Sequence, residues 1–296
     1  MGNSLLYCKD LSIYEIEEIL NRARVFKMDC NNKERYYKYQ NKFIANLFLE
    51  PSTRTRLSFE VAEKKLGSHV LNFVADSSSI QKGESINDTL RTLESLGVDV
   101  AVIRIKEELL ASLSNDLKMK IINAGEGQKE HPTQALLDLF TIREHFTHVK
   151  DLNVAIIGDI AHSRVARSNT HLLRKLGANI KFSGPMNLMA KDLKGEYLPI
   201  NEAIQWADVI MMLRIQQERM EESLLESKEE YNLKYGFTAD RLKLLKPNAI
   251  ILHPAPVNRG VEMDDSVVSN PQSKIFEQIT NGVFIRLAVI ERALEG

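Results

Sequence analysis

The chain has 296 residues, of which 44% are hydrophobic, and its 39 Lys and Arg residues nearly balance 40 Asp and Glu residues. This length and apolar content suffice for two buried cores, so two domains are expected. Because the formal net charge is only -1, neither a nucleic acid nor an anionic membrane surface is an expected partner. Any cationic site must therefore be a local concentration of charge.

The two cysteines, Cys8 and Cys30, lack CxxC or Cys/His spacing. This pattern indicates plain thiols in a reducing compartment and argues against a zinc site. The start of the sequence has no signal-peptide pattern, and no apolar run reaches the roughly 18 residues that a membrane span needs. We therefore expect a soluble, cytoplasmic protein without a membrane partner.

Strands and helices alternate along the first half of the sequence. After an N-terminal helix at residues 12–25, the patterns predict strand, helix, strand, helix and strand at residues 42–49, 53–66, 69–75, 86–96 and 98–105. A further helix and strand end at residue 122, and a loop at residues 123–130 leads into a long helix at residues 131–146. Such alternation predicts a parallel sheet covered by helices on both faces.

The alternation starts again in the second half. Strands are predicted at residues 153–157, 179–183, 208–213 and 249–252, and helices at residues 163–176, 202–206 and 240–245. The charged stretch at residues 216–234 is expected to be a solvated loop. We therefore place one domain at residues 1–149 and a second at residues 150–273, with a final helix at about residues 274–296 that packs back on the first.

Clusters of polar residues follow the predicted strands. In an open parallel sheet the carboxyl ends of the strands lie at one edge, where ligands bind. The clusters are at residues 52–55, 77–84, 104, 123–134, 158–164, 214–219 and 253–260. A binding site is expected where they meet.

The first cluster combines hydroxyl and guanidinium groups at the expected start of a helix. Ser52 is expected to cap the helix at residues 53–66, so that the N–H groups of its first turn and Arg54 surround one position. This arrangement suits a small phosphorylated molecule, although a capped helix with surface arginines is the simpler alternative. Arg56 is expected to form an ion pair with Glu60, four residues on, and to be structural.

Three motifs, taken together, resemble one enzyme family. They are SxRTR after a strand, HPTQ at the start of the long helix and HPAPVNRG after the last strand. In this order they are similar to the transcarbamylases, the aspartate/ornithine carbamoyltransferase family, over essentially the whole chain. The resemblance implies two doubly wound parallel-sheet α/β domains joined by two long helices. It also implies carbamoyl transfer from carbamoyl phosphate to the amine of L-aspartate, an early step of pyrimidine biosynthesis, without a metal or an organic cofactor.

The resemblance further implies which residues bind carbamoyl phosphate. Its phosphate ligands would be Ser52, Thr53, Arg54 and Thr55. Its carbonyl oxygen would be bound by Thr55, Arg104 and His131, and its NH2 group by Gln134 and the backbone carbonyls of Ala255 and Pro256. The expected catalytic residues are Arg54, Thr55, Arg104, His131 and Lys82.

The implied aspartate ligands come from the second domain. Arg164 would bind the α-carboxylate, and Arg214 with Gln216 would bind the side-chain carboxylate. Glu50 is expected to draw Arg164 and Arg219 towards the first domain when the domains close.

The polar segment at residues 76–85 contains Ser78 and Lys82. By itself this segment is typical of an exposed turn. In the family the corresponding loop crosses into a neighbouring subunit, so the resemblance implies a homotrimer in which Ser78 and Lys82 complete the next subunit's site, with Lys82 also binding aspartate. Association with regulatory chains or a dihydroorotase is left open.

Two other functions remain open at this stage. An ornithine or other amino-acid carbamoyltransferase would share SxRTR and HPxQ, but Arg214 and Gln216 suit an anionic side chain, and HPAP replaces the cysteine-containing segment of ornithine enzymes. A non-catalytic, anion-binding scaffold subunit is the second, and the filled catalytic positions argue against it. The segment GDIAHS lacks the glycine spacing of a nucleotide-binding loop.

Overall fold

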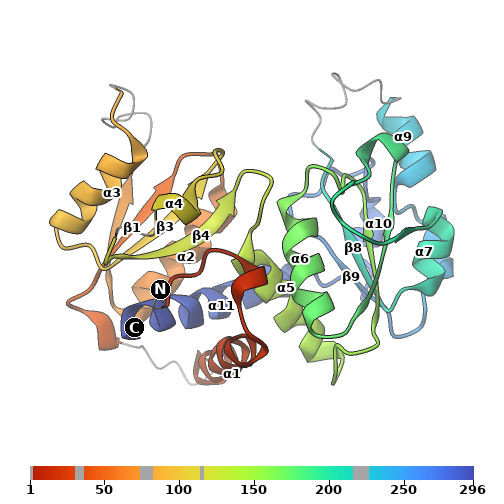
Figure 1. Cartoon of the computed structure of the whole chain (residues 1–296). Coiled ribbons are helices and arrows are strands. Elements are labelled where there is room, and N and C mark those ends of the chain that lie inside the picture. Colours follow the sequence, from red (N-terminus) through yellow and green to blue (C-terminus); the bar gives the residue numbers. More distant parts are fainter. Residues whose placement is uncertain (1–2, 31–36, 74–82, 114–116, 216–226) are drawn as a thin grey trace. The chain divides into compact units, whose positions relative to one another are not determined.

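The computed structural model describes residues 3–30, 37–73, 83–113, 117–215 and 227–296. It contains two compact units, Met1–Leu137 with Thr280–Gly296, and Asp138–Ile279 (Figure 1). The divisions fall inside helices α5 (Pro132–His145) and α11 (Ile275–Glu295), so both helices contribute residues to both units. The predicted boundary between residues 149 and 150 stays a prediction.

The first unit has a four-stranded parallel sheet in the order β2-β1-β3-β4. Its strands are β1 (Phe43–Phe48), β2 (His69–Phe73), β3 (Val100–Ile105) and β4 (Lys120–Glu126). Its helices are α1 (Ile13–Cys30), α2 (Thr53–Leu66), α3 (Ile86–Ser95) and α4 (Leu110–Leu113). The predicted range of α2 is confirmed, since Gly67 follows it in the left-handed conformation (φ 81°) that commonly ends a helix.

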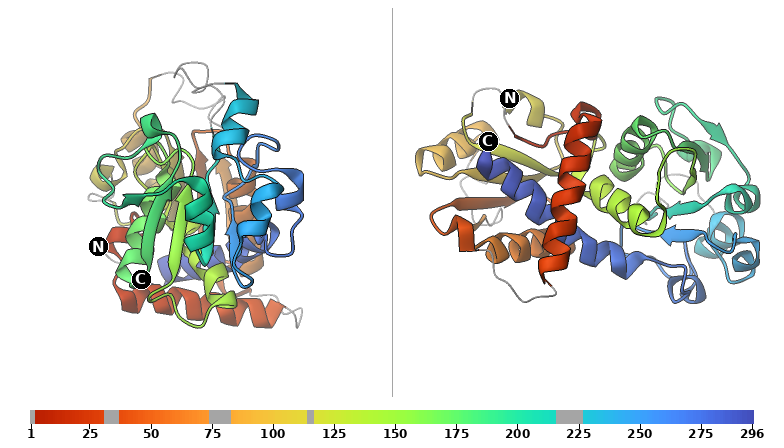
Figure 2. Two further views of the ribbon diagram at one scale, coloured as in Figure 1. Left: turned by 90° about the vertical axis from the view of Figure 1, so that its right-hand side faces the viewer. Right: turned by 90° about the horizontal axis from the view of Figure 1, so that it is seen from below.

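Helices cover both faces of this sheet. Leu90 of α3 and Leu110 of α4 pack on one face, and α2 lies on the other, where Glu63 bonds Asn46 of β1. Helix α11 lies beside α2, and α1 crosses α11 on its outer side (Figure 2). Strands β1, β3 and β4 are therefore largely buried and read as apolar runs, whereas the edge strand β2 is more exposed.

The N-terminal segment extends the sheet beyond β4. Leu5 N donates to Ile121 O (2.8 Å), and Asn123 N donates to Leu5 O (2.8 Å). The prediction that the strand ends at residue 122 is wrong, because β4 continues to Glu126. The extra residues pair with β3, where Ile105 lies opposite Glu126 after a shift in register. Such an irregular pairing is a tertiary contact that no local pattern could indicate.

The second unit has a five-stranded parallel sheet in the order β7-β6-β5-β8-β9. Its strands are β5 (Asn153–Ile157), β6 (Asn179–Ser183), β7 (Glu196–Tyr197), β8 (Val209–Met212) and β9 (Ile250–Leu252). Its helices include α6 (Arg164–Lys175), α7 (Ile200–Trp206), α9 (Lys228–Tyr235) and α10 (Asp265–Val268). The predicted ranges of β5 and β6 are confirmed, whereas β7 and α10 were not predicted.

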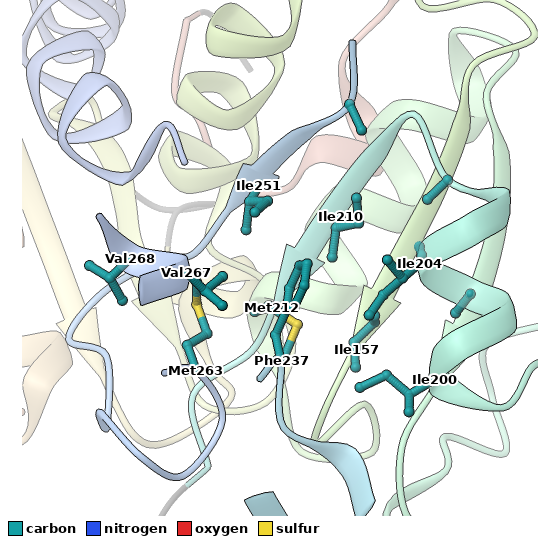
Figure 3. Close-up of a cluster of buried hydrophobic side chains, with 14 of the residues drawn as sticks. Ile157, Ile200, Ile204, Ile210, Met212, Phe237, Ile251, Met263, Val267 and Val268 are labelled. Carbon is teal, nitrogen blue, oxygen red and sulfur yellow. The ribbon is translucent and has the colours of Figure 1, made fainter. Parts of the chain in front are cut away.

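Alternate side chains of β5, β8 and β9 form the core of the second unit (Figure 3). Ile157 of β5, Met212 of β8 and Ile251 of β9 are fully buried and pack with residues of α7 and α10 such as Ile204 and Val267. Burying one such side chain contributes roughly 1.5–3 kcal/mol. This core fixes the carboxyl ends of the strands, from which the polar loops leave.

The charged stretch that was predicted to be a loop contains α9. Ser227 Oγ accepts a hydrogen bond from Glu230 N (3.2 Å), and the Glu230 carboxylate accepts one from Ser227 N (3.1 Å). This reciprocal capping box, followed by the buried Tyr231, explains why a helix forms. The loop prediction is therefore wrong for this part. Among the residues described, no helix combines the length and apolar character of a membrane span.

Candidate active site

Each sheet reverses its strand order at one point. In the first sheet β1 lies between β2 and β3, and in the second β5 lies between β6 and β8. Segments that leave the carboxyl ends of such neighbouring strands diverge and open a crevice. The pairing of Phe48 with Arg104 brings the segment after β1 to the end of β3, and the pairing of Ile157 with Met212 does the same for β5 and β8.

Residues 49–52 link β1 to α2 at the first of these points. Ser52 stands directly before α2, but its hydroxyl accepts no hydrogen bond from the described first turn, so the expected side-chain cap is wrong. Thr53 and Arg54 are exposed, Thr55 is buried, and the first turn contains no acidic residue. The first turn therefore adds no negative charge of its own to the positive end of the helix dipole, which suits an anion.

The expected ion pair between Arg56 and Glu60 is also wrong. Glu60 Oε1 bonds Lys64 Nζ (2.6 Å), and this hydrogen bond is the main cause that lowers the pKa of Glu60; Arg56 contributes less. In a helix, a Glu four residues before a Lys is the better orientation of such a pair. The Glu60 carboxylate therefore pairs with Lys64, and Arg56 remains exposed.

Arg104 lies at the end of β3, next to the segment that leaves β1. Its Nη1 donates to Ala124 O (3.4 Å), and its Nε lies 3.4 Å from Glu50 Oε2. Glu50 therefore contacts a cation of its own unit, whereas its expected partner Arg164 belongs to the second unit and Arg219 lies outside the described residues. The closure role of Glu50 stays a prediction.

His131 precedes α5 and is buried, with its Nδ1 atom 3.4 Å from the Thr133 hydroxyl. Gln134, one turn further on, is also largely buried. The preceding Glu130 carboxylate accepts a hydrogen bond from Cys8 N (2.6 Å), and burial raises the pKa of Glu130 against the opposing effect of that bond. The N-terminal segment thus anchors the turn that presents His131.

In the second unit, the segment after β5 turns sharply into α6. A Cβ atom on Gly158 (φ 129°) would lie 3.1 Å from Leu213, so only glycine fits this close approach of two loops. Ser163 Oγ accepts a hydrogen bond from Ala166 N (3.1 Å) and caps the helix. Arg164 is therefore the first helical residue after β5, and Arg214 is exposed two residues after the end of the neighbouring β8.

Ala255 and Pro256 follow β9, next to β8 in the sheet, and are joined by a cis peptide bond. The structure thus places eleven of the predicted ligands, together with Glu50, at or after the carboxyl ends of neighbouring strands of their own unit. In the first unit these are Glu50, Ser52, Thr53, Arg54, Thr55, Arg104, His131 and Gln134. In the second unit Arg164, Arg214, Ala255 and Pro256 are placed in the same way.

Four further candidates, Ser78, Lys82, Gln216 and Arg219, lie outside the described residues, so their roles stay predictions. Two buried carboxylates next to predicted ligands, Glu130 and Glu262, were missed. A single acidic residue in a polar loop gives no local signal of burial. Within the described part of the chain, no group of three or more His, Cys, Asp or Glu side chains is arranged to hold a metal ion.

Comparison with known proteins agrees with this geometry. The family model "Aspartate/ornithine carbamoyltransferase, carbamoyl-P binding domain" matches residues 3–144, and "Aspartate/ornithine carbamoyltransferase, Asp/Orn binding domain" matches residues 150–292. The aspartate carbamoyltransferase catalytic subunit of Listeria monocytogenes is 49% identical over 99% of this chain and 96% of its own length.

Two solved structures show the same fold. Trypanosoma cruzi aspartate transcarbamoylase in complex with carbamoyl phosphate has a TM-score of 0.89 at 30% identity, covering 98% of this chain and 95% of that one. Ornithine carbamoyltransferase from Pyrococcus furiosus also has a TM-score of 0.89 at 30% identity, covering 100% and 98%. The predicted fold of two parallel-sheet α/β domains is confirmed, and the chain belongs to the aspartate/ornithine carbamoyltransferase family.

Proposed function

We propose that this protein transfers the carbamoyl group of carbamoyl phosphate to the amine of L-aspartate, giving N-carbamoyl-L-aspartate and phosphate. The observation that carries the proposal is the 49% identity, over nearly the whole chain, to the catalytic subunit of an aspartate carbamoyltransferase. Fold similarity alone does not choose the acceptor, because an aspartate and an ornithine enzyme match with equal TM-scores. The choice of aspartate also rests on Arg214, which suits a carboxylate side chain, and on the HPAP segment, which replaces the cysteine-containing segment of ornithine enzymes.

The first unit would bind carbamoyl phosphate. In this proposal the first turn of α2 binds the phosphate through backbone N–H groups, the side chains of residues 52–55 and above all Arg54. Arg104, held beside Glu50, and the buried His131 join Thr55 around the carbonyl oxygen. The corresponding domains are residues 1–149 with the C-terminal helix, and residues 150–273 for aspartate.

The reaction needs charge stabilisation more than proton transfer by the protein. The neutral amine of aspartate attacks the carbonyl carbon, the bond to the phosphate oxygen breaks, and the departing phosphate takes the proton of the amine. Negative charge develops on the carbonyl oxygen, and removing one donor from such an oxyanion site typically costs about 3–4 kcal/mol. Alignment of the two substrates would supply much of the remaining rate enhancement.

The second unit would bind aspartate through cations that follow neighbouring strands. Arg164, at the start of α6, would bind the α-carboxylate, and Arg214, exposed after β8, the side-chain carboxylate. Gln216 and Lys82 are proposed to complete the aspartate-binding part of the site. The carbonyls of Ala255 and Pro256 would accept the hydrogen bonds of the carbamoyl NH2 group, together with Gln134.

We propose a homotrimer in which Ser78 and Lys82 complete a neighbouring site, acting in the cytoplasm in pyrimidine biosynthesis. Exposed apolar residues on α2 support assembly. Leu57 and Val61, one turn apart on this helix, are 49% and 43% exposed. Neighbouring exposed apolar side chains are typical of protein interfaces.

Turnover with alternative acceptors tests the proposed function. The purified protein with carbamoyl phosphate should release phosphate with L-aspartate and not with L-ornithine. N-(phosphonacetyl)-L-aspartate, which combines features of both substrates, should bind saturably and much more tightly than aspartate. Turnover of ornithine in place of aspartate would show that the protein is an ornithine carbamoyltransferase. Phosphate binding without any turnover would favour the non-catalytic scaffold subunit.

A mixing experiment tests the shared site. Inactive Lys82→Ala and Arg54→Ala proteins, dissociated and reassembled together, should regain activity, because some sites then receive both intact residues. Lack of recovery after subunit exchange has been verified by native mass spectrometry would contradict the homotrimer with shared sites.

A further inference from the structure

The side chains of His253 and Glu262 hold the turn at residues 253–260, which follows β9, through hydrogen bonds. Both side chains are fully buried. His253 N donates to Gln278 Oε1 (3.0 Å), and Gln278 Nε2 donates to Asp138 Oδ1 (2.7 Å). The start of the turn is therefore anchored inside the second unit through a chain of hydrogen bonds.

The contacts of His253 define its tautomer. Ala255 N lies 2.9 Å from Nδ1 of His253, and because a backbone N–H only donates, Nδ1 must be the acceptor. The ring proton is then on Nε2, which lies 3.2 Å from Glu262 Oε1 and donates to it. Ala255 has φ 49°, a left-handed conformation that a non-glycine residue keeps only where its surroundings hold it.

The same oxygen of Glu262 also accepts a hydrogen bond from the C-terminal part of the turn. Asn258 N donates to Glu262 Oε1 (2.6 Å), so one carboxylate oxygen joins residues on both sides of Ala255 and Pro256. The Asn258 side chain then donates through Nδ2 to Ile215 O (2.8 Å). Ile215 directly follows Arg214, so the network reaches the backbone of the proposed aspartate ligand.

We propose that Glu262 is a positioning residue of the carbamoyl transfer reaction. Through His253 and Asn258 it sets the carbonyls of Ala255 and Pro256 and the backbone next to Arg214, without contacting a substrate itself. This inference rests on the proposed function, because it takes these two groups as ligands of the carbamoyl NH2 group and of aspartate.

Two substitutions at one position separate positioning from general stability. Glu262→Ala leaves His253 Nε2–H and Asn258 N–H without their acceptor, so kcat should fall about 10- to 100-fold, the range expected when reacting groups shift by roughly 1 Å. The KM for aspartate should rise as well. Glu262→Gln keeps an acceptor oxygen of the same reach and should restore most of the activity.

Asp208→Ala is the matched control. Asp208 also accepts a backbone hydrogen bond, from Asn153 N (2.9 Å), and a second bond from Lys246 Nζ (2.8 Å), but it precedes β8 and lies at the opposite end of the sheet. This variant should lose stability with kcat and the aspartate KM unchanged. If Glu262→Ala does not fold, Asn258→Ala removes only the link to Ile215 and should raise the aspartate KM.

Hydrogen exchange without substrates separates a failure of this proposal from a failure of the proposed function. Amides of residues 253–260 should exchange at least about 10-fold faster in Glu262→Ala than in the wild type or Asp208→Ala, since each lost bond releases the turn locally. If the wild type fails to use aspartate, the proposed function fails while this measurement still stands. Unchanged exchange in this segment overturns the proposal, and so do kinetic constants of an active Glu262→Ala protein that match those of Asp208→Ala.

Discussion

Replacing Glu63 by Gln should remove a pH dependence from the folding of the first unit. Glu63 of α2 is 0% exposed, and its Oε2 accepts a hydrogen bond from Asn46 Nδ2 of β1 (2.8 Å). Its Oε1 and Asn46 Oδ1 are both buried without a hydrogen-bond partner among the described residues. A proton on Glu63 would let these two oxygens bond each other. Consistently, burial raises the pKa of Glu63 from its ordinary value of 4.5 to about 8.

The sign and size of the effect follow from this pKa. The folded chain holds a proton that the unfolded chain releases above pH 4.5, so the stabilisation is complete below pH 4.5 and is lost as pH rises towards 8. Each pKa unit corresponds to about 1.4 kcal/mol. Between pH 6 and pH 8 the wild type should therefore lose about 2 kcal/mol of unfolding free energy through Glu63 alone.

Urea unfolding at pH 6 and pH 8 measures this loss. Glu63→Gln stays neutral and, like a protonated Glu63, offers Asn46 both an acceptor and a donor, so its stability relative to the wild type should increase by about 2 kcal/mol between the two pH values. Glu60→Gln on the same helix is the control, because Lys64 lowers the pKa of Glu60 and its carboxylate is ionised throughout this range. If the free energies of unfolding of wild type and Glu63→Gln differ by the same amount at both pH values, Glu63 does not contribute this pH dependence.

Substitutions at three further positions test the proposed site: Arg54 and Arg214 as ligands, and Glu130 as the anchor of the turn before His131. Arg54→Ala should lower kcat at least about 100-fold with little loss of stability, because the side chain is exposed. Arg56→Ala on the same turn should keep near wild-type activity. Equal losses of activity in steady-state assays of the two variants would contradict the role of Arg54 as the phosphate ligand. Arg214→Ala should raise the aspartate KM about 10- to 100-fold, and a larger effect on the carbamoyl phosphate KM would count against it. Glu130→Ala should lower kcat more than Glu130→Gln, which still accepts from Cys8 N; equal kinetic constants would exclude an anchoring role.

Much of the local structure could be predicted from the sequence. The ranges of α2, β5 and β6 were predicted correctly, because hydrophobic periodicity and terminal glycines act over a few residues. The capping box of α9 was also present in the sequence, but the surrounding charge led to a loop prediction. The three motifs were sufficient to indicate the family.

The tertiary structure decided which of these residues meet. Strand order places the segment after β1 beside Arg104, and the pairing of Ile105 with Glu126 lengthens β4. Buried carboxylates such as Glu130, whose partner Cys8 is 122 residues away, depend on contacts that form only when the chain closes a long loop. Secondary structure and motif chemistry are properties of short segments, so the sequence by itself determined them. Burial and hydrogen-bond partners are properties of the packed chain, because the dielectric environment of a carboxylate is set by whatever surrounds it.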